Sequence, residues 1–468
     1  MIVVFICTLS LFALIGVSSS RAKGKSTKDY LLANQNVKPW LVGLSAVATN
    51  NSGYMFIGMI GYTYTVGLAS IWLMIGWIVG DFIASLFVHG KLRSYCEKYE
   101  LYSFGSILAN NNGKSNALLQ KLVGIISLAF LVAYAAAQFS AGGKALFAVL
   151  SIDQSIGITA GAFLVVLYCF SGGIRASIWT DAAQSIVMII AMFILVLYAV
   201  DAGGGINHSI SQLKSVSANY LTLNHLNSSK GILLFIVGWL FAGFGVVGQP
   251  HIMVRYMSLD DGKNIGKVRS YYYSWFTAFY LMAIFVGLFS RILLSNEGVF
   301  DPELALPLMA NNLLPGPLVG IILAGIFAAT ISTADSLIIS CTATLSNDIF
   351  PKFKHHYNVN KLFTIGVAFA ATGFALSNNS AVFDIVVYAW AILGTSFGPL
   401  LSVKLLDKSI PPAISIAMIL SGGVTTFLWN QFGLNEWIYE MTSGIVVPYC
   451  VFLGWSFMKS ETKIESHS

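Results

Sequence analysis

The stretch Ser45-Ala-Val-Ala-Thr-Asn-Asn-Ser-Gly-Tyr54 lies in the middle of an apolar run at 40–62, and it decides the fold. Its central residues, Thr49 to Gly53, are all small or polar. An unbroken membrane helix is ordinarily apolar at this depth, so the pattern favours a local unwinding whose freed carbonyls bind a cation. Packing of small residues, with hydrogen bonds between helices, is the alternative explanation.

The composition of the whole chain is that of a membrane protein. Of its 468 residues, 56% are hydrophobic and only 10% are charged, against roughly 25% charged in soluble domains. We expect an all-α integral membrane protein with about 13 transmembrane helices, since a span needs about 20 mostly apolar residues. The apolar runs lie near 2–19, 40–62, 69–92, 119–149, 154–173, 178–201, 232–254, 271–294, 316–344, 361–377, 382–404, 411–429 and 439–457.

The basic residues predict the orientation. If the N-terminus is outside, 22 of the 26 Lys and Arg, Arg255 among them, fall in segments that face the cytoplasm. Because Lys and Arg favour cytoplasmic loops, we expect a multi-pass protein of the plasma (inner) membrane with a cytoplasmic C-terminus. The two long outer connections, 202–230 and 295–315, each have room for a short surface helix.

A second interruption occurs in the run at 232–254, at Gly243-Phe-Gly-Val-Val-Gly-Gln-Pro250. Its glycines and Pro250 break the hydrogen-bond ladder of a helix. Two interrupted spans, five spans apart, indicate an inverted repeat with a binding site near the membrane midplane. A kink that serves only packing is the alternative.

The ninth apolar run contains Gly325-Ile-Phe-Ala-Ala-Thr-Ile-Ser-Thr-Ala-Asp-Ser336. Ser332 and Thr333 offer hydroxyl oxygens, and Ala329, one turn earlier, offers a carbonyl. Oxygen ligands of this kind suit a hard cation such as sodium. The hydroxyls could instead bond back to carbonyls of their own helix, but this leaves Asp335 unexplained.

A third polar cluster is Ser171-Gly-Gly-Ile-Arg-Ala-Ser-Ile-Trp-Thr-Asp181. Gly172 and Gly173 predict a tight turn. Asp181 then lies near the start of the next helix, where an acid is favoured by the helix dipole. The residue is therefore either a helix cap or an acid close to the inner end of an ion path.

The motifs of common enzymes and ATPases are missing from the sequence, including GxxxxGK[ST] and HExxH. We therefore expect no enzymatic activity, no cofactor and no metal other than sodium as the coupling ion. Uphill transport would depend on an ion gradient.

Several motifs in order resemble the sodium/solute symporter family, and most closely its bacterial sodium/proline symporters. They are Leu44-Ser-Ala46 leading to Ser52-Gly53, Trp179-Thr-Asp-x-x-Gln184, Gly248-Gln-Pro-His251, Ala328-Ala-x-x-Ser-Thr333, Tyr388-Ala-Trp-Ala391 and Phe397-Gly-Pro399. The resemblance implies one transporter domain over 1–468 with a leucine-transporter-like five-plus-five inverted repeat, spans 2–6 and 7–11. Its parts would be 1–39, a first repeat at 40–201, a second at 232–404, and two last helices with a tail at 405–468.

The resemblance also implies the site residues. The sodium-binding residues would be Ala48, Asn51, Ala329, Ser332 and Thr333. A possible second cation site would use Asp181, Asp335 and Ser336. The substrate-binding residues would be Asn50, Ser52, Gly53, Tyr54, Tyr134, Val246 and Pro250.

The implied function is sodium-coupled import of a small organic solute by alternating access, most simply an amino acid such as proline. Proline symporters, however, have Asp at the position of Asn50, Trp at that of Tyr54, and aromatic residues at those of Ala242 and Val246. Pantothenate, another carboxylate or a sugar-like solute therefore stays open. So do a membrane sensor with a transporter fold and a passive channel. The expected partners are sodium, the solute and the lipid bilayer, with no nucleic acid and no prediction of oligomeric state.

Overall fold

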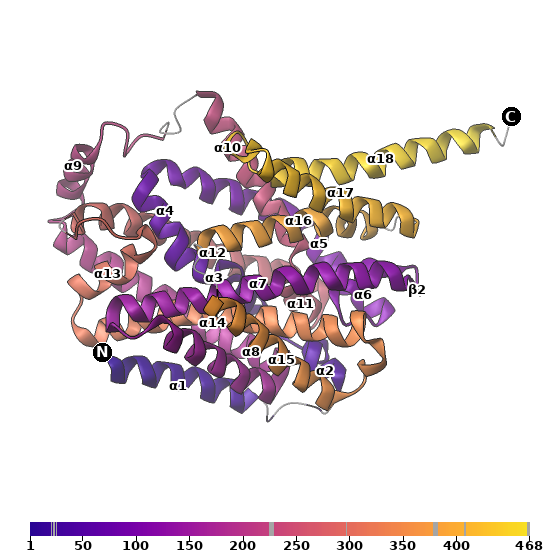
Figure 1. The fold of residues 1–468 in the computed structure, drawn as a ribbon, viewed down its shortest axis with the longest axis horizontal. Helices are drawn as coiled ribbons and strands as arrows, with labels where there is room; N and C mark the ends of the chain where they lie inside the picture. The colour runs from indigo at the N-terminus through magenta and orange to yellow at the C-terminus, as the bar shows by residue number, and fades with distance from the viewer. Residues whose placement is uncertain are drawn as a thin grey trace.

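The computed structural model describes residues 1–19, 21, 24, 26–223, 229–295, 297–377, 382–406 and 409–465, and these are almost entirely helical. Figure 1 shows most of the long helices running side by side along the long axis of the molecule, with the two termini at opposite ends of that axis.

The first half of the chain contains α1 (Ile2–Ser19), α2 (Thr27–Leu32), α3 (Pro39–Gly53), α4 (Met59–Val66), α5 (Ile71–Tyr99), α6 (Phe104–Ala109), the two-residue strands β1 (Asn110–Asn111) and β2 (Lys114–Ser115), α7 (Ala117–Leu150), α8 (Gln154–Ala202) and α9 (Ile206–Val216). The second half contains α10 (Ser229–Phe244), α11 (Pro250–Met257), α12 (Ile265–Leu293), α13 (Ala305–Leu313), α14 (Gly316–Thr344), α15 (Tyr357–Ser377), α16 (Val382–Lys404), α17 (Pro412–Gln431) and α18 (Met441–Glu465). β1 and β2 pair antiparallel.

Eleven helices among the described residues are long and apolar enough to cross a membrane. The multi-pass, all-α fold is thereby confirmed, whereas the count of thirteen is not. The difference lies in two predicted spans. The span at 40–62 is divided between α3 and α4, each too short to cross alone, and Gln154–Leu167 is a shorter apolar helix within α8.

α8 is not one straight helix. At a rise of about 1.5 Å per residue, its 49 residues would extend more than twice the roughly 30 Å of the hydrocarbon layer. The helix is broken at Gly173, whose φ of 58° and ψ of −144° are non-helical. A Cβ at this position would collide with the carbonyl oxygen of Tyr30. The turn predicted at Gly172–Gly173 is therefore confirmed.

Both predicted helix interruptions are present. α3 is broken at Ser52 (φ 48°, ψ −178°) and continues through a π-helical turn at Tyr54–Gly58 into α4. α10 ends at Phe244, a 3₁₀ turn follows at Gly245–Gly248, and α11 begins at Pro250. The expected short helices in the outer connections are also present, as α9 and α13.

α14 lies at the centre of the bundle. In its most apolar window, 83% of the residues are buried, compared with 22% in α1. It packs against α3, α7 and α8, and Figure 1 shows it beside α7 and α8. This position brings the hydroxyls of α14 to the interrupted helix α3.

The turn at Gly173 can be tested by substitution. We expect Gly173→Ala to destabilise the protein by about 1–3 kcal/mol, because its dihedral angles are nearly restricted to glycine and the added methyl meets the Tyr30 carbonyl. Thermal unfolding of the purified protein in detergent measures this. Gly366→Ala is the control, since a Cβ at Gly366 meets nothing within 4 Å. Equal unfolding midpoints for the two variants would contradict the account.

Candidate functional site

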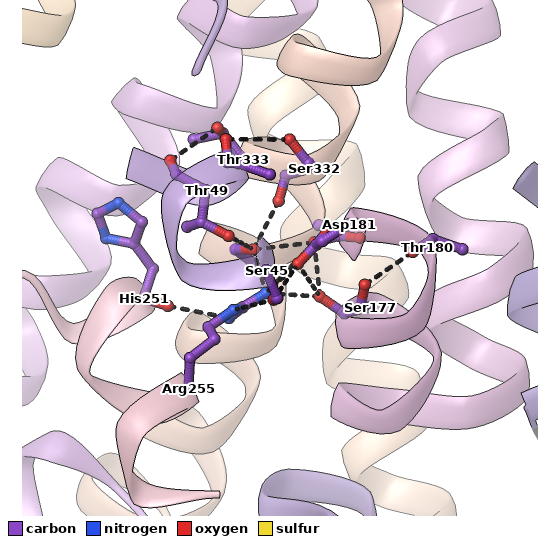
Figure 2. Close-up of polar contacts among 12 residues, drawn as sticks. Ser45, Thr49, Ser177, Thr180, Asp181, His251, Arg255, Ser332 and Thr333 are labelled. Atoms are coloured by element: carbon purple, nitrogen blue, oxygen red, sulfur yellow. Dashed lines mark hydrogen bonds and ion pairs between the residues drawn. The ribbon is translucent and has the colours of Figure 1, made fainter. Parts of the chain in front are cut away.

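The first part of the site lies where α14 crosses α3 (Figure 2). Ser332 Oγ lies 3.3 Å from the Ala48 carbonyl and 3.1 Å from the Ala329 carbonyl. Thr333 Oγ1 lies 2.9 Å from the Thr49 carbonyl and 3.2 Å from the same Ala329 carbonyl. Since both hydroxyls contact the Ala329 oxygen, three carbonyls and two hydroxyls gather around one point. The group is uncharged and consists only of oxygen atoms.

Four of the five predicted sodium residues, Ala48, Ala329, Ser332 and Thr333, thus come together. The fifth residue, Asn51, makes its contacts elsewhere: its carbonyl accepts the Tyr54 N–H, and its side-chain amide donates to the Val47 carbonyl at 2.8 Å. On α3 it is the Thr49 carbonyl that meets Thr333. Asn51 as a ligand stays a prediction.

The break at Ser52 leaves backbone groups that side chains satisfy. The Gly53 N–H donates to Gln138 Oε1 on α7 at 2.7 Å, and the Tyr54 N–H donates to Ser52 Oγ at 3.1 Å. A Cβ at Gly53 would lie only 2.8 Å from a methyl group of Thr330. Glycine is therefore needed here so that α3, α7 and α14 can approach one another.

Tyr134 on α7 connects the two interrupted helices. Its hydroxyl lies near that of Ser52, and its ring packs edge-on against His251 at 5.5 Å between centroids. His251 follows Pro250 at the start of α11. Val246, in the preceding 3₁₀ turn, is fully buried. The predicted substrate residues Ser52, Gly53, Tyr134 and Pro250 therefore lie along one path between the breaks.

Tyr54 lies in a separate aromatic layer. Its ring is 5.7 Å from that of Trp77 and 5.3 Å from that of Phe383, and Trp77 stacks on Trp239 at 5.6 Å. Phe383 and Trp239 also line a cavity of about 1370 Å³ together with residues such as Phe235, Tyr388, Tyr439 and Glu440. Tyr54 itself is 2% exposed. The aromatic layer thus lies between this cavity and the break in α3.

A cluster of charged side chains lies beside the oxygen group formed by α3 and α14 (Figure 2). Arg255 of α11 is fully buried, and its Nη2 lies 3.2 Å from Asp181 Oδ2 and 3.7 Å from Asp335 Oδ1. Arg255 Nη1 also donates to the His251 carbonyl at 2.9 Å. Asp181 is thus not a helix cap, because it lies two turns beyond the break at Gly173 and its carboxylate faces a guanidinium. That alternative is wrong.

Serine hydroxyls join the cluster to the oxygen group on α3 and α14. Ser45 donates to Asp181 Oδ2 at 2.6 Å, and Ser177 donates to Asp335 Oδ1 at 2.8 Å. Ser336 accepts from Arg255 and lies 3.0 Å from Thr49 Oγ1. The three predicted second-site residues, Asp181, Asp335 and Ser336, are therefore adjacent to one another.

Two carboxylates and one guanidinium leave this buried cluster with one excess negative charge when both acids are ionised. Such an excess is costly in a membrane interior and favours the binding of a further cation. Sequence reasoning missed Arg255, which it counted among the basic residues facing the cytoplasm. The available signal was its place four residues after His251, among the apolar residues Val254, Tyr256 and Met257.

The chain is similar to known transporters over nearly its whole length. The model of the sodium:solute symporter family matches residues 30–408. The chain is 30% identical over 465 residues to a sodium/proline symporter of Staphylococcus aureus, covering 93% of this chain and 89% of the relative. It is 28% identical over 426 residues to the high-affinity proline transporter PutP of Bacillus subtilis, covering 89% of both.

Among solved structures, a substrate-bound, outward-open Na⁺-coupled sialic acid symporter matches with a TM-score of 0.80 at 18% identity, covering 96% of each chain. At this identity the match establishes the fold. It confirms the expected leucine-transporter-like architecture. That α3 and α10–α11 belong to corresponding positions of two repeats stays a prediction.

Removal of Arg255 tests the charged cluster. We expect Arg255→Met to lower the free energy of unfolding by about 3–5 kcal/mol, because it leaves two buried carboxylates without their cation. Adding Asp335→Asn should restore part of the loss. Thermal unfolding followed by tryptophan fluorescence measures both. Arg291→Met is the control, since that guanidinium lies over the Tyr64 ring. If Arg255→Met unfolds at the same temperature as the control, Arg255 does not stabilise the two buried carboxylates.

Proposed function

Because the chain belongs to the sodium:solute symporter family, we propose that it imports L-proline together with sodium. Sodium-coupled symport across a membrane follows from the family. The choice of proline is supported by two relatives that cover most of the chain and are named as proline transporters. The substitutions at Asn50, Tyr54 and Val246 reshape the predicted pocket, so other small carboxylates and sugar-like solutes belong in the test.

The convergence of Ala48, Ala329, Ser332 and Thr333 carries the proposal for the main sodium site. Their oxygens come from α3 and α14, two helices far apart in the sequence. Sodium would replace the hydroxyl-to-carbonyl hydrogen bonds, which at 2.9–3.3 Å hold the oxygens close together. Asn51 would join as a fifth ligand if its carbonyl turns from the Tyr54 N–H.

The solute would bind between the two helix breaks, where Ser52, Gly53 and Tyr134 meet the start of α11. The freed N–H groups of an interrupted helix suit a carboxylate. In the predicted orientation the cavity beside the aromatic layer opens to the outside and admits the solute. Sodium bound between α3 and α14 then favours the outward-open state, and the solute completes the closure of the layer formed by Tyr54, Trp77 and Phe383.

When Asp181 and Asp335 are both ionised, their excess negative charge supports a second cation, either sodium or a proton, with Ser336 as a further ligand. We also propose that the protein resides in the plasma membrane with its N-terminus outside, and that it needs no cofactor besides sodium. The orientation is supported by the distribution of Lys and Arg.

The main sodium site is tested by Ser332→Ala and Thr333→Ala. Each should raise the sodium concentration for half-maximal uptake at least tenfold, since an oxygen ligand is lost. Proteoliposomes with an imposed sodium gradient and radiolabelled L-proline measure this. Ser340→Ala, two turns along α14, is the control, because the Ser340 hydroxyl has no hydrogen-bond partner within the described part of the chain. If wild-type vesicles accumulate no proline, a panel of amino acids and carboxylates identifies the solute. Accumulation of no solute at all would favour a sensor or a channel.

The second cation site predicts that Asp335→Asn changes the coupling. We expect the Hill coefficient for sodium to fall toward one, or the uptake to lose its dependence on pH if the second cation is a proton. Initial uptake rates over a range of sodium concentration and external pH distinguish the two. An unchanged Hill coefficient, sodium affinity and pH profile would exclude the site.

A further inference from the structure

A third buried acid lies outside both cation sites. Asp81 is in the membrane-spanning part of α5 and is fully buried. Within the described residues, no Lys, Arg or His forms an ion pair with it. An ionisable residue in the interior of a membrane protein is costly and marks a functional position by default.

Asp81 is held by two phenols of α12. Tyr272 donates to Asp81 Oδ2 at 2.7 Å, and Tyr273 donates to Asp81 Oδ1 at 3.0 Å. The Tyr272 hydroxyl in turn accepts from Asn50 Nδ2 at 2.5 Å. A continuous hydrogen-bonded chain therefore runs from Asp81 on α5, through Tyr272 on α12, to Asn50 on α3.

The donor-to-acceptor direction of these hydrogen bonds determines which end of the Asn50 amide faces Tyr272. A tyrosine hydroxyl has one hydrogen, and Tyr272 gives it to the carboxylate, the stronger acceptor. Tyr272 can then only accept from Asn50, which must present its NH₂ group. The amide oxygen of Asn50 is left buried with no hydrogen-bond partner in the described structure, in a residue that is 4% exposed.

The basic residues near Asp81 make their contacts with other groups. Arg269, one turn before Tyr273, donates to the Ser85 carbonyl at 2.6 Å and to the Ser85 hydroxyl at 3.2 Å. His89, on the same helix as Asp81, stacks on Tyr256 of α11 at 3.7 Å between centroids. A buried acceptor joined through two hydrogen bonds to a carboxylate is an arrangement that attracts a cation when that carboxylate is ionised.

Asn50 is also next to the main sodium site. It follows Thr49, whose carbonyl meets Thr333, and it precedes the break at Ser52 by two residues. We propose that Asp81 is a positioning residue for sodium: through Tyr272 it holds the Asn50 amide with its oxygen free to bind the ion, and its charge favours the ion's presence. The proposal rests on the proposed function, since it assigns further residues to sodium binding.

The test measures sodium binding without any solute. Purified protein in detergent is heated in sodium chloride or choline chloride of equal total concentration, and sodium-dependent stabilisation is followed by tryptophan fluorescence. Asp81→Asn should raise the sodium concentration for half-maximal stabilisation about tenfold, the effect of a unit charge roughly 10 Å from an ion at an effective dielectric constant of about 20. Tyr272→Phe keeps that charge but removes the hydroxyl that holds the Asn50 amide, so it should raise this concentration more than twofold. Tyr273→Phe is the matched control and should change this sodium concentration less than twofold. Tyr273 contacts the same carboxylate but takes no part in the hydrogen-bonded path from Asp81 to Asn50.

A charge exchange separates this role from a structural one. Asn50→Asp combined with Asp81→Asn moves the acid from one end of this hydrogen-bonded path to the other. The double variant should recover most of the sodium affinity that Asp81→Asn loses. If Asp81 had only a structural role, Asp81→Asn would lower the unfolding midpoint without sodium and leave the sodium concentration for half-maximal stabilisation unchanged. That result overturns the proposal. If wild-type protein shows no stabilisation specific to sodium, the sodium coupling itself fails. If wild-type protein responds and every variant responds alike, only the role of Asp81 fails.

Discussion

The structure depends on one constraint, which is that backbone broken inside a membrane must find partners for its freed polar groups. The break in α3 at Ser52 meets this requirement with side chains from two other helices. Gln138 of α7 accepts the Gly53 N–H, and hydroxyls of α14 donate to carbonyls just before the break. α14 must therefore be central and rich in small polar residues. The oxygens that meet at the break are also those proposed as sodium ligands.

The buried carboxylates around this break are stabilised in two ways. At Asp181 and Asp335 a guanidinium supplies a counter-ion, and serine hydroxyls donate to one oxygen of each carboxylate. At Asp81 two phenols stabilise the carboxylate without neutralising it. Both arrangements keep negative charge close to α3 at a cost in stability. Such a cost is consistent with a protein whose function is to attract a cation into the bilayer.

The aromatic layer divides the interior into a region connected with the large cavity and a tightly packed region around the break. The Tyr54 ring contacts Trp77, and Trp77 stacks on Trp239. These three residues come from the π-helical turn after α3, from α5 and from α10, in that order. The layer is therefore built from elements of both halves of the chain. Rigid movement of one repeat against the other is the general mode of transport in folds with inverted repeats.

Much of this fold could be read from local sequence. Apolar runs predicted the helices because the bilayer demands about 20 apolar residues in a row, and clusters such as Thr49–Gly53 predicted the breaks because polar residues at this depth have a local cost. The hydroxyl cluster in the ninth apolar run pointed to Ser332 and Thr333, and the resemblance to known symporters implied the same residues. The tertiary structure alone decided that Arg255 lies between Asp181 and Asp335, that Thr49 rather than Asn51 contacts Thr333, and that Asp81 reaches Asn50 through Tyr272. These partners are 74 residues apart for Arg255 and Asp181, and 191 for Tyr272 and Asp81. Hydropathy and motif spacing report what one segment needs, whereas the partner of a buried charge depends on which helices pack together.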